Sequence, residues 1–155
     1  MLRSKRNKTY ELTKGAHKKR KKSRSAVDYE ALAEFRFQLR RFLSFSEANA
    51  KKNGLTSHQY QALLTIKGLS QPHRYMSVGE LADFLLVKPH TAVGLIDRMA
   101  KLGFLKRFRD SEDGRRILVT LTRKGEQRLS NVARVNWAEL RSRQLALPRI
   151  LKSLS

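Results

Sequence analysis

The 155-residue chain contains no cysteine, and this absence removes several kinds of chemistry at once. A chain without thiols forms no disulfide, senses no oxidant through a thiol, and offers neither a cysteine nucleophile nor cysteine-ligated zinc. It also has no apolar run near the ~20 residues that are needed to cross a bilayer. Its N-terminus lacks the apolar core of a signal peptide. These absences predict a cytoplasmic protein without a membrane-spanning segment.

Acidic residues are scarce, because 13 Asp and Glu stand against 34 Lys and Arg, which gives a formal net charge of +21. Such a charge favours polyanionic partners, chiefly nucleic acid or an anionic membrane surface. Residues 1–25 hold eleven basic side chains and one acid. Because this segment is polar and nearly free of large apolar groups, we expect a disordered basic arm. The arm is either a solvated tail or a segment that neutralises phosphates.

Sequence patterns of catalysis and metal binding are missing as well. No nucleophile stands in a recognisable elbow, and there is no glycine-rich phosphate loop. Asp97 is placed to pair with Lys101 one helical turn away. The acids of residues 110–114 resemble a calcium loop in composition but miss its spacing, and neighbouring arginines would repel a cation. We therefore expect no enzyme, cofactor or resident metal, although a regulatory zinc site assembled from distant residues stays open.

Two helices are predicted in the first half of the chain. Apolar residues at three- and four-residue steps predict a helix from Asp28 to about Asn53. This helix carries more aromatic residues than one buried face needs, so a second subunit is one surface it could pack against. The next helix begins with a capping box, Thr56 with Gln59, and is expected to end at Gly68.

A helix-turn-helix is predicted from residue 77 onward. Ser77 and Glu80 form a second capping box, which starts a short helix that ends near Leu85. Pro89 suits the first position of a further helix, which is expected to run to Gly103. Two short helices joined by a tight turn are the helix-turn-helix arrangement. The buried stripe of the second helix is expected to comprise Ala92, Leu95, Ile96, Met99 and Leu102.

A β-hairpin and a long helix are predicted to follow. Residues 105–109 and 116–121 can pair as antiparallel strands, which makes the motif a winged helix. Thr122 can cap the last long helix. The inner side of that helix is expected to carry Leu129, Val132, Ala133, Val135, Asn136 and Trp137.

A winged helix fits DNA, since the second helix of a helix-turn-helix lies in the major groove with its N-terminal residues at the base edges. His90 and Thr91 can hydrogen-bond to bases, and Val93 can meet a thymine methyl group. Gly94 costs about 1 kcal/mol relative to Ala inside a helix, which close approach to DNA or to a neighbouring helix would explain. The candidate DNA-binding residues of this helix are Pro89, His90, Thr91, Val93, Gly94 and Arg98.

The stretch from Leu55 to Gly125 resembles the multiple-antibiotic-resistance regulator (MarR) family, above all in "VGELA", "VGLIDRMAKLGFLKR" and "DSEDGRRILVTLT". The resemblance implies homodimers with interlocked terminal helices, recognition helices in the major groove and wings in the minor groove of a pseudo-palindromic operator. It also implies release from DNA by a small lipophilic or phenolic effector in many members. The basic arm is unusual for the family, and the region after Gly125 looks shorter than the family's two closing helices.

The wing of this family carries an Asp-x-Arg motif, which falls here on Asp113 and Arg115. The resemblance implies that the Arg reaches the minor groove while the Asp steadies it. Asp113 and Gly114 also suit a hairpin turn. Arg109 is a further candidate DNA contact in the wing, and Arg116 is expected to meet a phosphate or another side chain.

The sequence thus predicts a mainly α protein with a small β-hairpin wing, a winged helix-turn-helix between N- and C-terminal dimerisation helices. The MarR-like domain spans 26–155, with 26–54 and 123–155 for dimerisation and 55–122 for DNA binding. The expected function is that of a homodimeric transcriptional repressor that binds double-stranded DNA, is nucleoid-associated when bound, and has no membrane partner. The alternative is a basic nucleoid-associated or RNA-binding protein without a specific operator.

Overall fold

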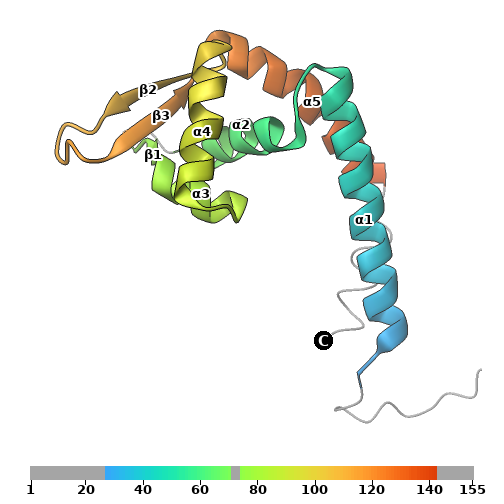
Figure 1. Ribbon diagram of the computed structural model, residues 1–155. Helices are drawn as coiled ribbons and strands as arrows, with labels where there is room; N and C mark the ends of the chain where they lie inside the picture. Colours follow the sequence, from blue (N-terminus) through green and yellow to red (C-terminus); the bar gives the residue numbers. More distant parts are fainter. Residues whose placement is uncertain (1–26, 71–73, 143–155) are drawn as a thin grey trace, which may run out of the picture.

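The computed structural model describes residues 27–70 and 74–142, which form five helices and three short strands (Figure 1). In chain order these are α1 (Tyr29–Lys52), α2 (Ser57–Leu69), β1 (Met76–Ser77), α3 (Val78–Leu85), α4 (Pro89–Lys101), β2 (Leu105–Arg109), β3 (Ile117–Leu121) and α5 (Arg123–Ser142). The mainly helical class and the winged helix-turn-helix are confirmed. The expected basic arm, 1–25, and residues 143–155 of the expected C-terminal dimerisation region lie outside the described residues.

Side-chain caps begin the helices where the sequence predicted them. The Thr56 hydroxyl accepts from the Gln59 amide at 3.2 Å, and the Gln59 side chain accepts from the Thr56 amide at 2.9 Å. Ser77 and Glu80 make the same reciprocal pair at the start of α3. Each box satisfies backbone donors that the first turn of a helix leaves without partners. The expected end of α2 at Gly68 is wrong by one residue. Gly68 does not adopt the left-handed backbone conformation that would end a helix, and α2 continues to Leu69.

The core lies where α2, α3 and α4 meet the sheet and the first half of α5. Its largest fully buried side chains are Leu63, Ile66, Leu81, Ile96, Met99, Val119 and Val132. Four of the five residues expected in the buried stripe of α4 are buried. Leu102 is the exception: it stands at the C-cap, where the helix ends, and is 44% exposed.

The sheet has three antiparallel strands in the order β1-β3-β2. The hairpin pairs Leu105 with Leu121 and Arg109 with Ile117, so its second strand begins one residue later than expected. The short strand β1 was not predicted from the sequence. It pairs Met76 with Val119 and consists of two residues, too few to produce an alternating pattern.

The last described helix, α5, begins against the base of the wing. Thr122 accepts a hydrogen bond from the Gly125 amide at 3.1 Å, as a helix cap should. A Cβ atom placed on Gly125 would lie 1.9 Å from the Phe104 carbonyl oxygen, so only glycine fits there. Farther along the helix, Leu129, Val132 and Asn136 are buried. The expected inner positions of Val135 and Trp137 are wrong within one protomer, since both side chains are exposed.

Buried polar side chains join α5 to α1. The Asn49 side-chain amide donates to the Asn136 side-chain oxygen at 2.8 Å and to the Val132 carbonyl at 3.1 Å. The Asn136 amide in turn donates to the Ser46 hydroxyl at 2.7 Å. This network lies near the C-terminal end of α1, whereas the N-terminal part of the helix extends away from the winged helix (Figure 1).

The tight packing at Gly125 predicts a large loss of stability on a small change. Gly125→Ala forces the backbone of α5 away from Phe104, and such overpacking should lower the free energy of unfolding by about 2 kcal/mol. Gly68→Ala is the matched control, because nothing lies within 4 Å of its added methyl group. That change should stabilise the protein by about 0.5–1 kcal/mol through helix propensity. Urea unfolding followed by circular dichroism measures both, and equal effects would contradict this account.

Candidate nucleic-acid interface

The helix α4 presents the candidate residues of the recognition helix on its outer side. Pro89 takes the first helical position, and the following His90 and Thr91 are exposed. Val93 is 46% exposed, an apolar side chain directed away from the core. Arg98 is also exposed, and Gly94 is half-buried. The opposite side of the helix is fixed by the buried Ala92, Leu95, Ile96 and Met99, so the candidate residues have a constant orientation.

A strained turn sets the angle between α3 and α4. Leu86 adopts left-handed backbone angles, φ 53° and ψ 42°, and its side chain is 92% exposed. A non-glycine residue in this conformation costs roughly 1–2 kcal/mol. The turn is held by hydrogen bonds from the Leu86 and Val87 amides to the Asp83 and Ala82 carbonyls, at 3.1 and 3.0 Å. Sequence reasoning missed this residue, because the usual signal for such a turn is a glycine.

An ion pair connects α4 with the first strand of the wing. Arg107 of β2 donates to the Asp97 carboxylate of α4. The expected pairing of Asp97 with Lys101 is therefore wrong. Asp97 lies on the side of α4 that faces the wing, and the fold brings Arg107 within reach although it is ten residues away in sequence.

The tip of the wing is organised by its acidic residues. The Asp113 carboxylate accepts from the Arg115 amide at 3.1 Å and from the Arg115 guanidinium at 3.2 Å. The Asp110 carboxylate accepts from the Glu112 amide at 3.0 Å. The Arg115 side chain is 93% exposed, so Asp113 directs it without covering it. The contact between Asp113 and Arg115 that the sequence predicted is present.

Two further candidate arginines are directed back toward the protein. Arg109 donates to the Gly114 carbonyl at the long distance of 3.5 Å. Arg116 lies 3.5 Å from the Asp110 carboxylate and 3.7 Å from the Glu80 carboxylate. Of the two partners expected for Arg116, a phosphate or another side chain, the structure provides the side chains.

Glu80 links the start of α3 with the wing, a connection that the sequence did not reveal. Its carboxylate accepts from the Ser77 amide and hydroxyl, both at 2.8 Å, and from Arg74 at 2.7 Å. Hydrogen bonds from Ser77, first from its backbone and then from its side chain, lower the pKa of Glu80 below 4.5, and the charges of Arg74 and Arg116 add to this effect. The cap of α3 is therefore also an electrostatic contact of the wing.

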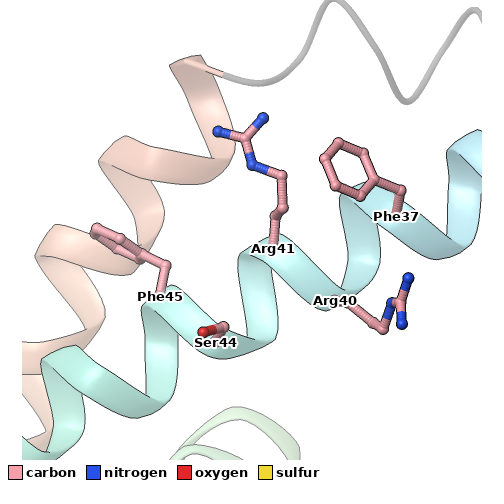
Figure 2. Close-up of a pocket in the computed structure, with 5 residues that line it drawn as sticks. All are labelled: Phe37, Arg40, Arg41, Ser44 and Phe45. Carbon is pink, nitrogen blue, oxygen red and sulfur yellow. The ribbon is translucent and has the colours of Figure 1, made fainter.

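Two open hollows lie away from the recognition helix. One, of about 590 Å³, is lined by Phe37, Arg40, Arg41, Ser44 and Phe45, all from α1. Figure 2 shows Phe37, Arg41 and Phe45 following one another along one side of α1, with Phe45 directed toward α5. The Arg41 guanidinium lies 5.6 Å from the centre of the Phe37 ring. The other hollow is a groove of about 380 Å³ between α2 and α5, in which Lys67 pairs with Glu126 at 2.5 Å.

Neither a metal cluster nor a membrane helix is present in the part of the chain that the structure describes. Within residues 27–70 and 74–142, no three His, Asp or Glu side chains gather so that they could hold an ion. None of the helices in these ranges combines the length and the apolar character that crossing a bilayer requires.

The helix-turn-helix, with a hairpin packed behind its second helix, defines a winged-helix protein. Residues 53–116 match the model of the MarR family, which confirms the resemblance seen in the sequence over this part of the chain.

Named relatives agree with this assignment. The transcriptional activatory protein BadR of Rhodopseudomonas palustris is 40% identical over 74 residues, which are 46% of this chain and 41% of BadR. The transcriptional repressor YetL of Bacillus subtilis is 32% identical over 97 residues, 57% of this chain and 58% of YetL. The chain therefore spans about half the length of these relatives. A mutant of Staphylococcus aureus MepR bound to an oligodeoxyribonucleotide shares the fold, with a TM-score of 0.62, 17% identity, and coverage of 84% of this chain and 100% of MepR.

The lowered pKa of Glu80 predicts a pH-dependent contribution to stability. Because the folded-state pKa lies below 4.5, the ionised carboxylate stabilises the fold at pH values above 4.5, and this stabilisation is lost as the pH falls through the folded-state pKa. Glu80→Gln should therefore be less stable than wild type at pH 7 and should approach it in acid. Thermal unfolding between pH 7 and pH 3 measures the difference.

The control for this experiment is Ser77→Ala, which removes the hydroxyl that donates to Glu80. In that background the pH dependence of the Glu80→Gln effect should become smaller. A stability difference that stays constant across the pH range would contradict the assigned role of the carboxylate charge.

Proposed function

We propose that the protein is a transcriptional regulator that binds a pseudo-palindromic operator in double-stranded DNA as a homodimer. The observation that carries this proposal is that the protein exposes two elements suited to DNA. One is the outer side of α4, and the other is the Arg115 side chain, which Asp113 orients at the wing tip. The MepR complex supports DNA as the ligand, because that relative of the fold is bound to an oligodeoxyribonucleotide. The high positive charge of the chain supports it as well.

Of repression and activation, we propose that the protein acts by repression. The relatives act in opposite senses, since BadR is named an activatory protein and YetL a repressor. Repression requires only that a bound dimer occupies its operator, whereas activation requires a further contact with the transcription machinery.

The major groove is proposed to receive the N-terminal half of α4. His90 and Thr91 carry hydrogen-bonding side chains at the start of the helix, where base edges are closest in helix-turn-helix complexes. Val93 follows on the exposed side and is suited to the methyl group of thymine. Pro89 leaves the first turn of the helix without one backbone donor, which is no loss at that position.

The minor groove beside it is proposed to receive Arg115. A narrow minor groove in A·T-rich DNA has a strong negative potential that attracts arginine. Because Asp113 already orients the guanidinium, less side-chain entropy is lost when Arg115 binds. Arg109 and Arg116, which turn toward the wing and α3, are proposed to contribute less to the contact.

Three single changes in the wing test this assignment. Arg115→Ala should weaken operator binding about tenfold or more, most of all where A·T pairs lie under the wing. Asp113→Ala should reproduce part of that loss, because Arg115 remains but is no longer oriented. Arg116→Ala serves as the neighbouring control and should have the smallest effect of the three. Fluorescence anisotropy with labelled operators gives the affinities. If Arg116→Ala failed to bind while Arg115→Ala bound normally, the assignment of residues in the wing would be wrong.

The homodimer is proposed because α1 exposes apolar side chains that one protomer leaves uncovered. Helix α1 has 24 residues, of which Ser46, Asn49 and Ala50 alone are buried. The hollow beside Phe37 and Phe45 is lined by this helix alone, as an incomplete interface would be (Figure 2). On α5, Val135 and the 64%-exposed Trp137 extend the apolar surface. A second subunit would bury these groups. The large apolar residues of α1 that are exposed are Tyr29, Leu32, Phe37, Leu39 and Leu43.

The introduction of negative charge into this surface should separate the subunits. Leu39 and Leu43 stand one helical turn apart on α1, and both are almost half exposed. The double change Leu39→Asp and Leu43→Asp places four carboxylates in a dimer interface, so light scattering at micromolar concentration should report a monomer. Leu86→Asp is the control, because it introduces the same residue at an exposed leucine far from α1 and should leave a dimer. A wild-type protein that is monomeric yet binds a palindrome tightly would refute the dimer.

A small lipophilic or phenolic effector is proposed to act through the groove between α2 and α5. Its walls include the apolar Leu64, Leu129 and Ala133, and Lys67 offers a cation at the rim. The groove joins an element of the winged helix to the helix that reaches α1, so an occupant could change the separation of the two recognition helices.

The experiment that tests the function as a whole is the selection of bound sequences from a random DNA pool. A regulator of the proposed kind should enrich one symmetric motif whose half-sites lie about 10 base pairs apart. The competing function, a nucleoid-associated or RNA-binding protein, is favoured by the net charge of +21 and predicts binding without an enriched motif. If the selection enriched no motif, the result would contradict an operator-binding regulator and support a nucleoid-associated or RNA-binding protein.

A further inference from the structure

The wing carries a small apolar cluster on the face of its sheet that is turned away from the core. Leu118 of β3 is buried, yet it does not belong to the main core cluster. Its partner across the ladder is Phe108 of β2. The Phe108 ring meets the Tyr75 ring edge to face, with centroids 4.9 Å apart. Because successive residues of a strand point to opposite faces, this outer cluster lies on the other side of the sheet from the buried Val119.

The two rings of the outer cluster cover Leu118 but are themselves uncovered. Tyr75 is 48% exposed and Phe108 is 37% exposed. Their planes stand at 90° to each other, so they form a corner rather than a flat platform. A corner suits one inserted apolar side chain, whereas single-stranded nucleic acid stacks its bases on the faces of rings. The wing and α1 lie at opposite ends of the molecule, so a dimer formed through α1 would leave the corner accessible (Figure 1).

The border of the outer cluster presents positive charge to the solvent. Arg74 and Arg116 both pair with Glu80, at 2.7 and 3.7 Å. The cations are the outer members of these pairs, since the two arginine side chains are 65% and 48% exposed and that of Glu80 is 32% exposed. The Asp110 side chain, which Arg116 also approaches, is only 14% exposed. At the other end of the cluster, Lys106 is exposed on the same face of β2. An approaching partner would meet the cations first, which favours an acidic one.

We infer that the outer cluster is a docking site for an acidic segment of another protein, with an apolar side chain of that segment in the corner between Tyr75 and Phe108. The carboxylates of the segment meet Lys106 and Arg74 at the border. This site goes beyond the proposed DNA binding, because it uses the face of the wing that is turned away from α4. A duplex held by α4 and the tip of the wing leaves it open.

Selection from a displayed library of random short peptides tests the site, with the full chain as bait, alone and with excess duplex DNA. The enriched peptides should carry an aromatic or aliphatic residue among acidic ones, and the duplex should not displace them. Tyr75→Ala should weaken the binding of a selected peptide about tenfold, because it removes one wall of the corner. Phe108→Leu should also weaken it, although leucine keeps an apolar cover over Leu118. Lys106→Gln should weaken it most at low salt.

Phe84→Ala is the matched control, because it removes an aromatic side chain that is 59% exposed on α3 and should leave peptide binding unchanged. Phe108→Leu should also bind the operator as wild type does, which shows that the wing is intact.

Three outcomes would overturn the inference. The first is the enrichment of no peptide, or of peptides without acidic residues. The second is equal binding to wild type, Tyr75→Ala and Phe108→Leu, since the net charge of the chain would then hold the peptides. The third is competition by a single-stranded oligonucleotide that Tyr75→Ala abolishes, which would assign the corner to nucleic acid. Failure of the proposed operator binding would change none of these results, because the selection on the chain alone involves no DNA.

Discussion

The contact between Gly125 and the Phe104 carbonyl is the constraint on which the arrangement of the whole structure depends. The Thr122 amide donates to the Phe104 carbonyl at 3.1 Å, and the Thr122 hydroxyl donates to the Gly103 carbonyl at 2.6 Å. Lys124 adds a hydrogen bond to the Leu102 carbonyl at 2.8 Å. The end of α4, the base of the wing and the start of α5 therefore meet within a few residues. A side chain at position 125 would push α5 off this junction.

This junction also determines how α4 and the wing, which we propose to face DNA, relate to α1. Beyond it, α5 reaches α1 and joins it through the buried amides of Asn49 and Asn136. Burying amides without partners is costly, so a network in which each amide finds an acceptor favours one register between the two helices. The recognition helix, the wing and α1 are consequently connected through one rigid helix. In a dimer formed through α1, a shift of α5 would move α4 and the wing of a subunit together.

The sequence predicted those parts of the structure that depend on neighbouring residues. The capping boxes at Thr56 and Ser77, the start of α4 at Pro89 and the contact of Asp113 with Arg115 all involve residues at most a few positions apart, so their chemistry is visible in the sequence. The pairing of Asp97 with Arg107 and of Glu80 with Arg116 joins different elements and depends on the tertiary fold. The exposure of Trp137 was mispredicted because periodicity identifies an apolar side of a helix but not the molecule that covers it.

The arrangement of the arginines shows why net charge alone gives a poor account of recognition. A guanidinium held by a carboxylate brings little net charge to a phosphate, so we propose that Arg107 and Arg116 act mainly on the geometry of the wing. Arg115 combines a carboxylate partner with nearly full exposure, which orients it while leaving donors for a ligand. Arg98 makes no such pair among the described residues and lies above the one helical residue of α4 that has no side chain. The few acidic residues thus make two groups of arginines. Those paired with a carboxylate and turned toward the protein stabilise the wing, and those with exposed donors are free to bind a ligand.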